Sequence, residues 1–274
     1  MRIVFSRKGF DVKAGGVPSP ILPDGTLISL PIPDEYGPHR YKDVSIAQGR
    51  LDQLVADLTG GRLRGSSKMH LDPDLRRDAL PRLRGWRPMF GQGGAARSHL
   101  TSQSVGPGDL FLFFGWFKEV ELHRGRHRFV RSAPHQHIFF GWMHIGERWD
   151  VPFSNRPAWS LRHPHLINDY VGGSTVFVAV DATPESAGVF KKVAEPLILT
   201  APGQTRSLWR IPDWMRPRNS HQALTYHKSA SRWRTAKSGT YLQTVGRGQE
   251  FVLDTAHYPE AVRWAHKLIQ KHSC

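Results

Sequence analysis

The chain has 274 residues and a formal net charge of +15, because 38 Lys and Arg residues outnumber 23 Asp and Glu residues. Its one cysteine, Cys274, excludes a disulfide framework and a cysteine-based zinc site. No apolar run is long enough to span a bilayer or to form a signal peptide, so we expect a cytoplasmic protein with no membrane partner. The charge favours DNA or a nucleotide as partner, because a field of this sign attracts polyanions. A basic surface over an aromatic core is the alternative.

The first predicted element is a β-strand over residues 1–6, and a loop rich in glycine and proline follows it to about residue 25. Loops of this length inside a compact domain are usually functional or disordered. Prolines restrict this loop, glycines allow a ligand to approach closely, and cations and carboxylates occur together in it. We therefore assign a catalytic role to Asp11 and phosphate binding to Arg7, Lys8, Gly16 and Ser19. An Ω-loop that binds nothing explains the same residues.

The second predicted element is a helix over residues 43–59. Four apolar residues at helical spacing would form its buried face, namely Leu51, Leu54, Val55 and Leu58. Two glycines follow at residues 60 and 61, and they give this helix its end.

The segment His70-Leu71-Asp72-Pro73-Asp74 contains the sharpest cluster of reactive side chains. In an extended segment alternate residues project to one side, so His70, Asp72 and Asp74 would converge. One imidazole and two carboxylates can bind a divalent metal ion, or they can supply a general acid or base with an orienting carboxylate. We assign a catalytic role to all three. In the structural alternative Asp72 caps a helix that begins at Pro73, and the other two side chains are solvated.

A glycine-rich stretch at residues 91–94 precedes a short predicted helix that carries Ala95, Ala96 and Leu100. Free backbone N–H groups at such a turn can bind a phosphate, so Gln92 and His99 join the predicted phosphate-binding residues. The stretch lacks the spacing of a P-loop and of the dinucleotide fingerprint, and a tight packing turn is the alternative.

A β-rich middle follows, with strands over residues 109–117, 136–149 and 174–180. The first of them is apolar on both faces, as expected for a strand buried on both sides or for the wall of a barrel. The second is its expected antiparallel partner. The remaining predicted elements are strands over residues 194–200 and 251–253 and a helix that begins at Pro259.

Four histidines in the middle of the chain have the alternate spacing of metal ligands, in the pairs His135 with His137 and His163 with His165. No third or fourth ligand is near either pair in the sequence, and the number and geometry of ligands define a zinc site. We therefore assign no metal ion. The sequence does not identify a cofactor.

Arg247 and Glu250 precede the last predicted strand. In a regular strand Glu250 and Phe251 point to opposite faces, so Glu250 can face a site while Phe251 enters the core. We assign Arg247 and Glu250 to nucleotide binding. A surface carboxylate paired with an arginine is the alternative.

The central segment resembles the small pseudobarrels of the PUA, ASCH and EVE group. The resemblance rests on Val105-Gly106-Pro107-Gly108-Asp109, the apolar strand after it and a later strand that ends in Ile145-Gly146-Glu147. It covers about residues 102–181. It implies a β-rich subdomain that binds RNA or an unusual base in a cleft beside the barrel.

Several short motifs, spread over nearly the whole chain, resemble the third nucleotide modification associated domain family. They are Phe5-Ser6-Arg7-Lys8-Gly9-Phe10-Asp11, Gly16-x-Pro18-Ser19-Pro20, Asp24-Gly25-Thr26, His70-Leu71-Asp72-Pro73-Asp74-Leu75, Asp109-Leu110-Phe111-Leu112-Phe113-Phe114-Gly115 and Gly246-Arg247-Gly248-Gln249-Glu250-Phe251-Val252. The resemblance implies a place in prokaryotic or phage systems that hypermodify DNA bases, beside other base-modification enzymes. It implies no particular reaction.

These observations predict one elaborated α+β domain over residues 1–274. We expect a mixed, mostly antiparallel sheet or PUA-like pseudobarrel in the middle, flanked by helices toward both ends. The expected function is that of a nucleotide- or DNA-binding enzyme of a base-modification system, with transfer and hydrolysis both open. Two alternatives are a non-catalytic reader of modified nucleic acid through the PUA-like pocket, and an enzyme that acts on a free modified-nucleotide precursor.

Overall fold

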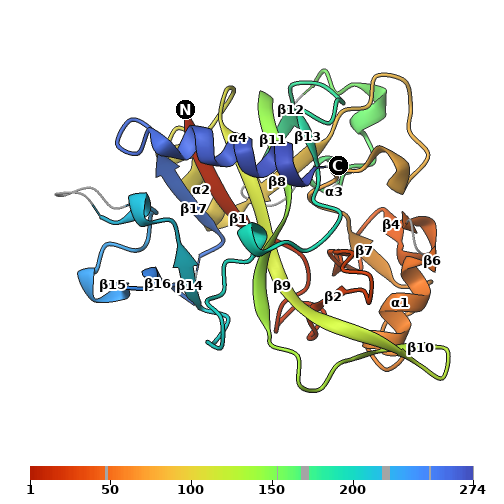
Figure 1. Ribbon diagram of the computed structural model, residues 1–274. Helices are drawn as coiled ribbons and strands as arrows, with labels where there is room; N and C mark the ends of the chain where they lie inside the picture. The colour runs from red at the N-terminus through yellow and green to blue at the C-terminus, as the bar shows by residue number, and fades with distance from the viewer. Residues whose placement is uncertain (47–48, 153, 168–172, 218–222, 247, 274) are drawn as a thin grey trace.

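The computed structural model describes residues 1–46, 49–152, 154–167, 173–217, 223–246 and 248–273. A nine-stranded sheet forms its centre (Figure 1). The strands of this sheet are β1 (Arg2–Arg7), β2 (Ser19–Ile21), β8 (Met89–Gly93), β9 (Leu110–His123), β10 (Arg126–Phe129), β11 (Gln136–Val151), β12 (Ser174–Ala179), β13 (Ala187–Val189) and β17 (Glu250–Asp254). They follow the order β17-β1-β9-β11-β12-β8, with β2 and β10 added to β9 and β13 added to β11. β1 and β2 run parallel to β9, and the other pairs are antiparallel.

The central sheet curls so strongly that side chains from distant strands meet in its concave interior. β8 and β9 are separated by β11 and β12, so in a flat sheet they would lie about 14 Å apart. The ring of Phe90 on β8 nevertheless lies 4.9 Å from Phe111 and 5.3 Å from Phe113, both on β9. Phe177 of β12 fills the same interior, 5.1 Å from Phe111. The sheet is therefore a half-barrel with an aromatic interior.

Two elements cover the outer face of this sheet, α4 (Glu260–His272) and β14 (Leu208–Ile211). Trp264 of α4 packs against Phe5 and Phe139, with ring centroids 5.8 and 6.1 Å apart. Trp209 of β14 packs against Phe114 at 5.0 Å. Because both faces of β9 meet apolar partners, its first five residues are fully buried, as its two-sided apolar sequence predicts.

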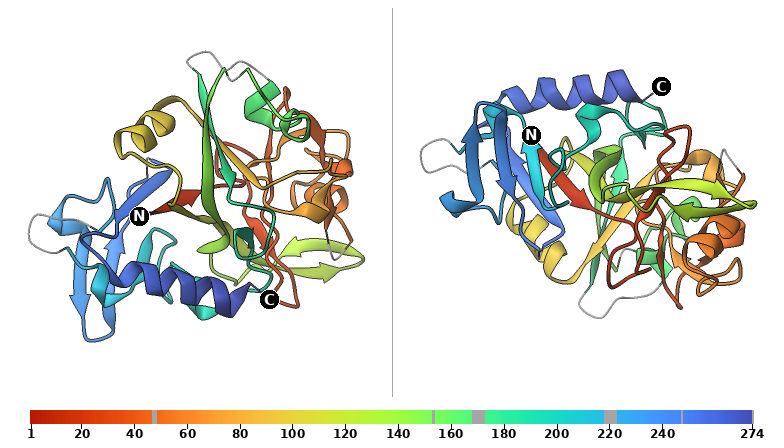
Figure 2. Two further views of the ribbon diagram at one scale, coloured as in Figure 1. Left: turned by 90° about the horizontal axis from the view of Figure 1, so that it is seen from above. Right: turned by 60° about the horizontal axis from the view of Figure 1, so that its bottom comes forward.

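The remaining elements lie on two sides of the central sheet (Figure 2). On one side β14 continues into a three-stranded sheet with β15 (Trp233–Ala236) and β16 (Gly239–Gln243). On the other side a second apolar core gathers around α1 (Leu51–Leu58), Tyr41 and Phe10. The other strands and helices are β3 (Ile32–Pro33), β4 (His39–Arg40), β5 (Ser45–Ile46), β6 (Gly49–Arg50), β7 (Lys68–His70), α2 (Gly94–Ser102), α3 (Pro164–Ile167) and the 3-10 helices Tyr41–Asp43, Arg77–Ala79, Ala158–Ser160, Glu195–Leu197, Asp213–Met215 and Ala230–Arg232.

The α+β class and the mostly antiparallel central sheet are confirmed. The predicted helices after residue 94 and after Pro259 are α2 and α4. β9 pairs antiparallel with β11, as expected. The PUA-like resemblance and the organisation as one domain stay predictions. The predicted strands that the structure confirms are those at residues 1–6, 109–117, 136–149, 174–180 and 251–253, which are β1, β9, β11, β12 and β17.

Two predicted elements are wrong in extent or type. The helix expected over residues 43–59 begins only at Leu51, because β5 and β6 pair with each other before it. Residues 194–200 form a 3-10 helix and isolated bridges to Ile138 and Trp209 in place of a strand.

The expected helix at Asp72–Pro73 and the expected turn at residues 91–94 are also wrong, and the two errors have one cause. Residues 89–93 form strand β8, and Asp74 bridges to Met89 on that strand. The carboxylate of Asp72 accepts the backbone N–H of Gly91 at 2.8 Å, so it caps no helix. The two segments therefore stabilise each other as extended neighbours.

Within the described part of the chain, no helix is both long enough and apolar enough to cross a membrane. Cys274 lies outside the described residues, so the structure adds nothing to the prediction made from it.

Candidate functional site

A cavity of about 270 Å³ lies where the C-terminal end of β1 meets β7 and β8. Its walls come from distant parts of the chain, including the loop after β1, α3 and single residues of β9 and β11. We call it the His–Asp cavity. The side chains that give it chemical character are Arg7, Lys8, Asp11, Lys13, His70, Asp72, Gln92, Trp116, His137, His165 and Arg206.

His70 is the last residue of β7, and a carboxylate fixes the orientation of its ring. Its Nδ1 lies 3.0 Å from Oδ2 of Asp34, so Nδ1 carries a proton and donates it to the carboxylate. This hydrogen bond lowers the pKa of Asp34. In the neutral imidazole the other nitrogen, Nε2, then holds a lone pair, and it lies 3.9 Å from Oδ2 of Asp72.

Asp72 is the centre of the cluster, and its side chain is only 5 % exposed. Its Oδ1 accepts the Gly91 N–H and lies 3.2 Å from Nε2 of the fully buried His163. Burial acts to raise the pKa of Asp72. The imidazoles around it, chiefly His163, act in the other direction and hold the pKa at about 2. Asp72 is therefore an anion at neutral pH.

His165 belongs to α3 and approaches the same carboxylate from the other side. Its Nε2 lies 3.7 Å from Oδ2 of Asp72, and its Nδ1 lies 3.1 Å from the hydroxyl of Ser174. Burial lowers the pKa of His165 to about 3, although the charge of Asp72 opposes this shift. His165 is therefore a neutral imidazole at pH 7.

One atom from each of these three residues points into a common space. One ligand atom each from His70, Asp72 and His165 lies within 4.8 Å of the other two. The imidazole rings of His70 and His165 meet edge to face at 4.9 Å. The cluster thus presents two imidazoles and one carboxylate on the wall of the His–Asp cavity.

Two arginines approach the cavity without a carboxylate partner. Arg7 donates hydrogen bonds to the carbonyl oxygens of Gly246 and Gly248, and Arg206 lies over the ring of Trp116 at 4.3 Å. In the described part of the chain neither guanidinium has a carboxylate within ion-pair distance. Burial lowers the pKa of Arg206, and the positive charge of Arg7 lowers it further. An anion between them would relieve this repulsion.

Lys8 and Gln92 share a buried acceptor behind the cavity wall. Both donate to Oε1 of Glu250, Lys8 at 2.8 Å and Gln92 at 2.6 Å. The side chain of Glu250 is 1 % exposed and its Oε2 has no hydrogen-bond partner among the described residues. Glu250 therefore positions the two side chains that reach the cavity.

His137 completes the wall as a neutral group. Trp209 donates its indole N–H to Nδ1 of His137 at 3.0 Å. Burial lowers the pKa of His137 to about 3, and the charges of Arg206 and Arg7 act in the same direction. His137 therefore offers an uncharged imidazole to the cavity.

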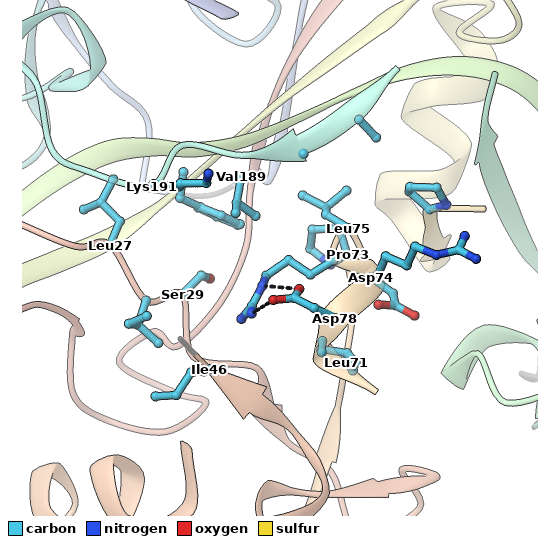
Figure 3. Close-up of a pocket in the computed structure, with 18 of the residues that line it drawn as sticks. Leu27, Ser29, Ile46, Leu71, Pro73, Asp74, Leu75, Asp78, Val189 and Lys191 are labelled. Carbon is cyan, nitrogen blue, oxygen red and sulfur yellow. Dashed lines mark hydrogen bonds and ion pairs between the residues drawn. The ribbon is translucent and has the colours of Figure 1, made fainter. Parts of the chain in front are cut away.

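A larger cavity of about 520 Å³ also has Asp72 in its wall, and Figure 3 shows many of the side chains that line it. Apolar side chains such as Leu27, Leu75 and Val189 line much of it, so we call it the apolar cavity. Asp74 faces this cavity, and the guanidinium of Arg82 binds both of its oxygens at 2.6 and 2.7 Å. Asp74 therefore does not join His70 and Asp72 as the alternate spacing predicts.

The structure brings some of the predicted site residues together and separates others. Those that line the His–Asp cavity are Arg7, Lys8, Asp11, His70, Asp72 and Gln92. Asp11 also organises its own loop, because its carboxylate accepts the N–H groups of Lys13 and Ala14 at 2.7 Å. The roles assigned to these residues stay predictions.

Three predicted phosphate-binding residues lie elsewhere. The hydroxyl of Ser19 accepts the N–H of Leu30 in the interior. Gly16 faces the guanidinium of Arg62. His99 lies 3.0 Å from the hydroxyl of Thr225. Arg247 lies outside the described residues.

Sequence reasoning did not assign Asp34, His165 or Arg206 to the site. The alternate spacing of His163 and His165 was the available signal, but their partner Asp72 lies about 90 residues earlier in the chain. Only the fold shows that these residues meet.

A family model described as nucleotide modification associated domain 3 matches residues 2–254. This span includes every side chain that lines the His–Asp cavity. No curated protein and no solved structure matches the chain.

Proposed function

The chain belongs to the nucleotide modification associated domain 3 family, and from this premise we propose that it is an enzyme that acts on a base within DNA. The His–Asp cavity would hold the target nucleotide. The walls of the cavity supply arginines for a phosphate and the His70–Asp72–His165 cluster for the reaction.

The phosphate would bind between Arg7 and Arg206. A guanidinium forms paired, charge-assisted hydrogen bonds to a phosphate, and these are about twice as strong as neutral ones. Trp116 restricts Arg206 by stacking, and backbone carbonyls hold Arg7. Both cations are therefore oriented before a ligand arrives.

The volume of the cavity suits a single nucleotide unit. At about 270 Å³ the cavity lies near the lower end of the about 300–1,000 Å³ typical of small-molecule sites, so its size favours one nucleotide unit over a longer segment. A base in a duplex would have to leave the stack to enter it, at a cost of a few kcal/mol. The net charge of +15 favours the polymer as the source of this nucleotide.

The reaction would take place at the His70–Asp72–His165 cluster. The carboxylate of Asp72, which stays ionised, and the imidazole of His165, which stays neutral, can polarise a nucleophile or receive its proton. Both transfer to the base and hydrolysis at the base need such a group.

One observation carries this proposal: two arginines with no carboxylate partner among the described residues share a cavity with a buried His–Asp–His cluster. A structural ion-pair network would pair those arginines with the available carboxylates. Here Asp72 faces imidazoles. Asp11, the other carboxylate of this cavity, accepts N–H groups of its own loop and acts on Arg7 and Arg206 only beyond ion-pair distance.

A direct test compares the nucleosides of DNA from cells that produce the protein together with its co-encoded modification enzymes. Wild type is expected to yield a modified nucleoside by mass spectrometry, and Asp72→Asn is expected to abolish it. Arg128→Gln is the matched control, because Arg128 forms an exposed ion pair with Glu121 on the β9–β10 hairpin. Unchanged product from Asp72→Asn would contradict the proposal.

Binding assays with the wild-type protein distinguish this proposal from the two alternatives, a reader of modified nucleic acid and an enzyme that acts on a free nucleotide precursor. A reader would yield no product and would bind a modified oligonucleotide more tightly than the plain one. A precursor enzyme would bind a mononucleotide with little dependence on salt, whereas binding to DNA weakens steeply as salt rises. In both assays Arg206→Gln should weaken binding, because the phosphate contact is common to them.

A further inference from the structure

We propose that His70, Asp72 and His165 bind one first-row divalent metal ion of borderline softness, the class that includes Zn²⁺, Fe²⁺ and Co²⁺. This inference goes beyond the proposed function, because it concerns a cofactor and does not depend on the nucleotide. It rests on the geometry of the cluster, on the groups that hold its ligands and on the close packing around it.

The ligand atoms are nearly at the spacing that such an ion requires. Bonds of 2.0–2.2 Å to nitrogen and oxygen place tetrahedral ligands about 3.3–3.5 Å apart. The Oδ2 of Asp72 lies 3.7 Å from Nε2 of His165 and 3.9 Å from Nε2 of His70. The nitrogens that the two histidines offer lie within 4.8 Å of each other, so closing the cluster around an ion requires the two imidazole rings to approach each other by up to about 1.5 Å.

Each ligand is also held by a second group on its other polar atom. Asp34 accepts from Nδ1 of His70, and the hydroxyl of Ser174 is bonded to Nδ1 of His165. The Gly91 N–H holds the Oδ1 of Asp72, and His163 lies beside that oxygen. Metal-bound histidines almost always have such outer partners, which fix the ring and leave the other nitrogen for the ion.

Gly91 shows how closely the protein packs around this cluster. A Cβ at this position would overlap the ring of His165. β8 therefore passes directly against the imidazole, and its N–H reaches Asp72 at the same time. The absence of a side chain at Gly91 is what lets one strand orient two of the three ligands.

The ligand types select the class of ion. Two imidazoles with one carboxylate suit Zn²⁺ and its first-row neighbours, whereas Mg²⁺ and Ca²⁺ prefer sites made of oxygen atoms. Three protein ligands leave coordination positions open toward the His–Asp cavity. An ion in this place can polarise a water molecule or an oxygen of the base.

A network of histidines and one aspartate without an ion would explain the short distances differently. In that case the imidazoles would serve only to balance the buried charge of Asp72. The two explanations differ in a measurable way, because only the first predicts saturable binding of metal that requires all three side chains.

The experiment is calorimetric titration of chelator-treated protein with Zn²⁺, Co²⁺ and Mg²⁺ separately. We expect one Zn²⁺ or Co²⁺ per chain and no measurable binding of Mg²⁺. Asp72→Asn and His165→Gln should each weaken Zn²⁺ binding at least about 100-fold. His144→Gln should bind as wild type does, because His144 lies beside His266, away from the cavity. Equal binding by all variants, or no binding by wild type, would overturn the proposal.

Two further measurements distinguish a variant that has lost the metal site from a variant that has failed to fold. The thermal midpoint of metal-free His165→Gln is compared with that of metal-free wild type. Added Zn²⁺ should then raise the midpoint of wild type and leave the variant unchanged, since a ligand stabilises only the state that binds it. A nucleotide titration distinguishes the two proposals: metal binding without nucleotide binding contradicts only the proposed function, and the reverse contradicts only the metal site.

Discussion

The His–Asp cavity and the apolar cavity both have Asp72 in their walls, whereas Asp74 lines the apolar cavity, and the two carboxylates have different partners. Asp72 faces imidazoles and a backbone N–H, so among the described residues its charge has no fixed cation beside it. Asp74 is neutralised by a bidentate arginine. The difference shows that the partners of a buried carboxylate decide whether it can bind a ligand. Its position in the sequence does not decide this.

The largest expected effect concerns stability on the side of the apolar cavity. Asp74→Ala should lower the free energy of unfolding by about 3–5 kcal/mol, because it leaves the largely buried guanidinium of Arg82 without its carboxylate partner. Asp78→Ala is the control. Asp78 pairs with Arg76 but is 72 % exposed, so about 0–1 kcal/mol is expected. Urea denaturation measures both, and equal losses would break the contrast between a buried and an exposed pair.

The next effect concerns the His–Asp cavity alone. Gly91→Ala should weaken Zn²⁺ binding about 10- to 100-fold, because the added methyl group displaces His165 and disturbs the N–H that holds Asp72. Gly106→Ala is the matched control, since a Cβ there meets open space. Calorimetric titration measures the two affinities. The same affinity in both variants would mean that β8 does not position the ligands.

A third effect depends on pH and on His137. The pKa of about 3 in the folded protein lies below the usual value of 6.5, so between these pH values the unfolded chain binds more protons. Stability is therefore lost as the pH falls below 6.5. His137→Asn, which keeps an acceptor for Trp209, should lose about 1 kcal/mol less than wild type between pH 7.5 and pH 5.5. Parallel pH profiles of the unfolding free energy would show that His137 is not neutral in the fold.

The smallest effect is a coupling between the two arginines of the His–Asp cavity. If Arg7 and Arg206 hold one phosphate, the two variants Arg7→Gln and Arg206→Gln should each weaken mononucleotide binding. The loss of binding free energy in the double variant should then differ from the sum of the two single losses by about 1 kcal/mol. Arg206→Gln combined with Arg76→Gln provides the comparison, because Arg76 lines the apolar cavity. That pair should be additive. If the losses of binding free energy add in both pairs of variants, the two arginines do not hold the same phosphate.

Much of the central sheet could be predicted from the sequence because its signal is local. The two-sided apolar run of β9 predicts a buried strand, and the helical spacing of apolar residues in α4 predicts a helix, without reference to other parts of the chain. The helix considered at Asp72–Pro73 does not form, although both residues are common at the start of a helix. Strand β8 lies beside them and supplies a β-bridge and an N–H donor, and these favour an extended segment. The helix after residue 43 was shortened in the same way by the pairing of β5 with β6.

Only the part of the candidate site that comes from the N-terminal half of the chain could be predicted. His70 and Asp72 are close in sequence, so their proximity was visible from spacing. His165 and Arg206 reach the same cavity from α3 and from the segment before β14, and nothing local in the sequence specifies this approach. Asp74 is also close to His70 in the sequence, yet its carboxylate is bound by Arg82, eight residues later, and its predicted catalytic role stays a prediction.

The position of β1 has a consequence for how this protein is made. β1 lies between β9 and β17, so the strand that ends in Arg7 pairs with residues 250–254. A ribosome releases the first of these segments long before the second, and pairing between such distant segments slows folding. Nascent chains stalled after β9 and before residue 250 would carry β1 paired on one edge and bare on the other, and a bare strand edge can pair with another chain.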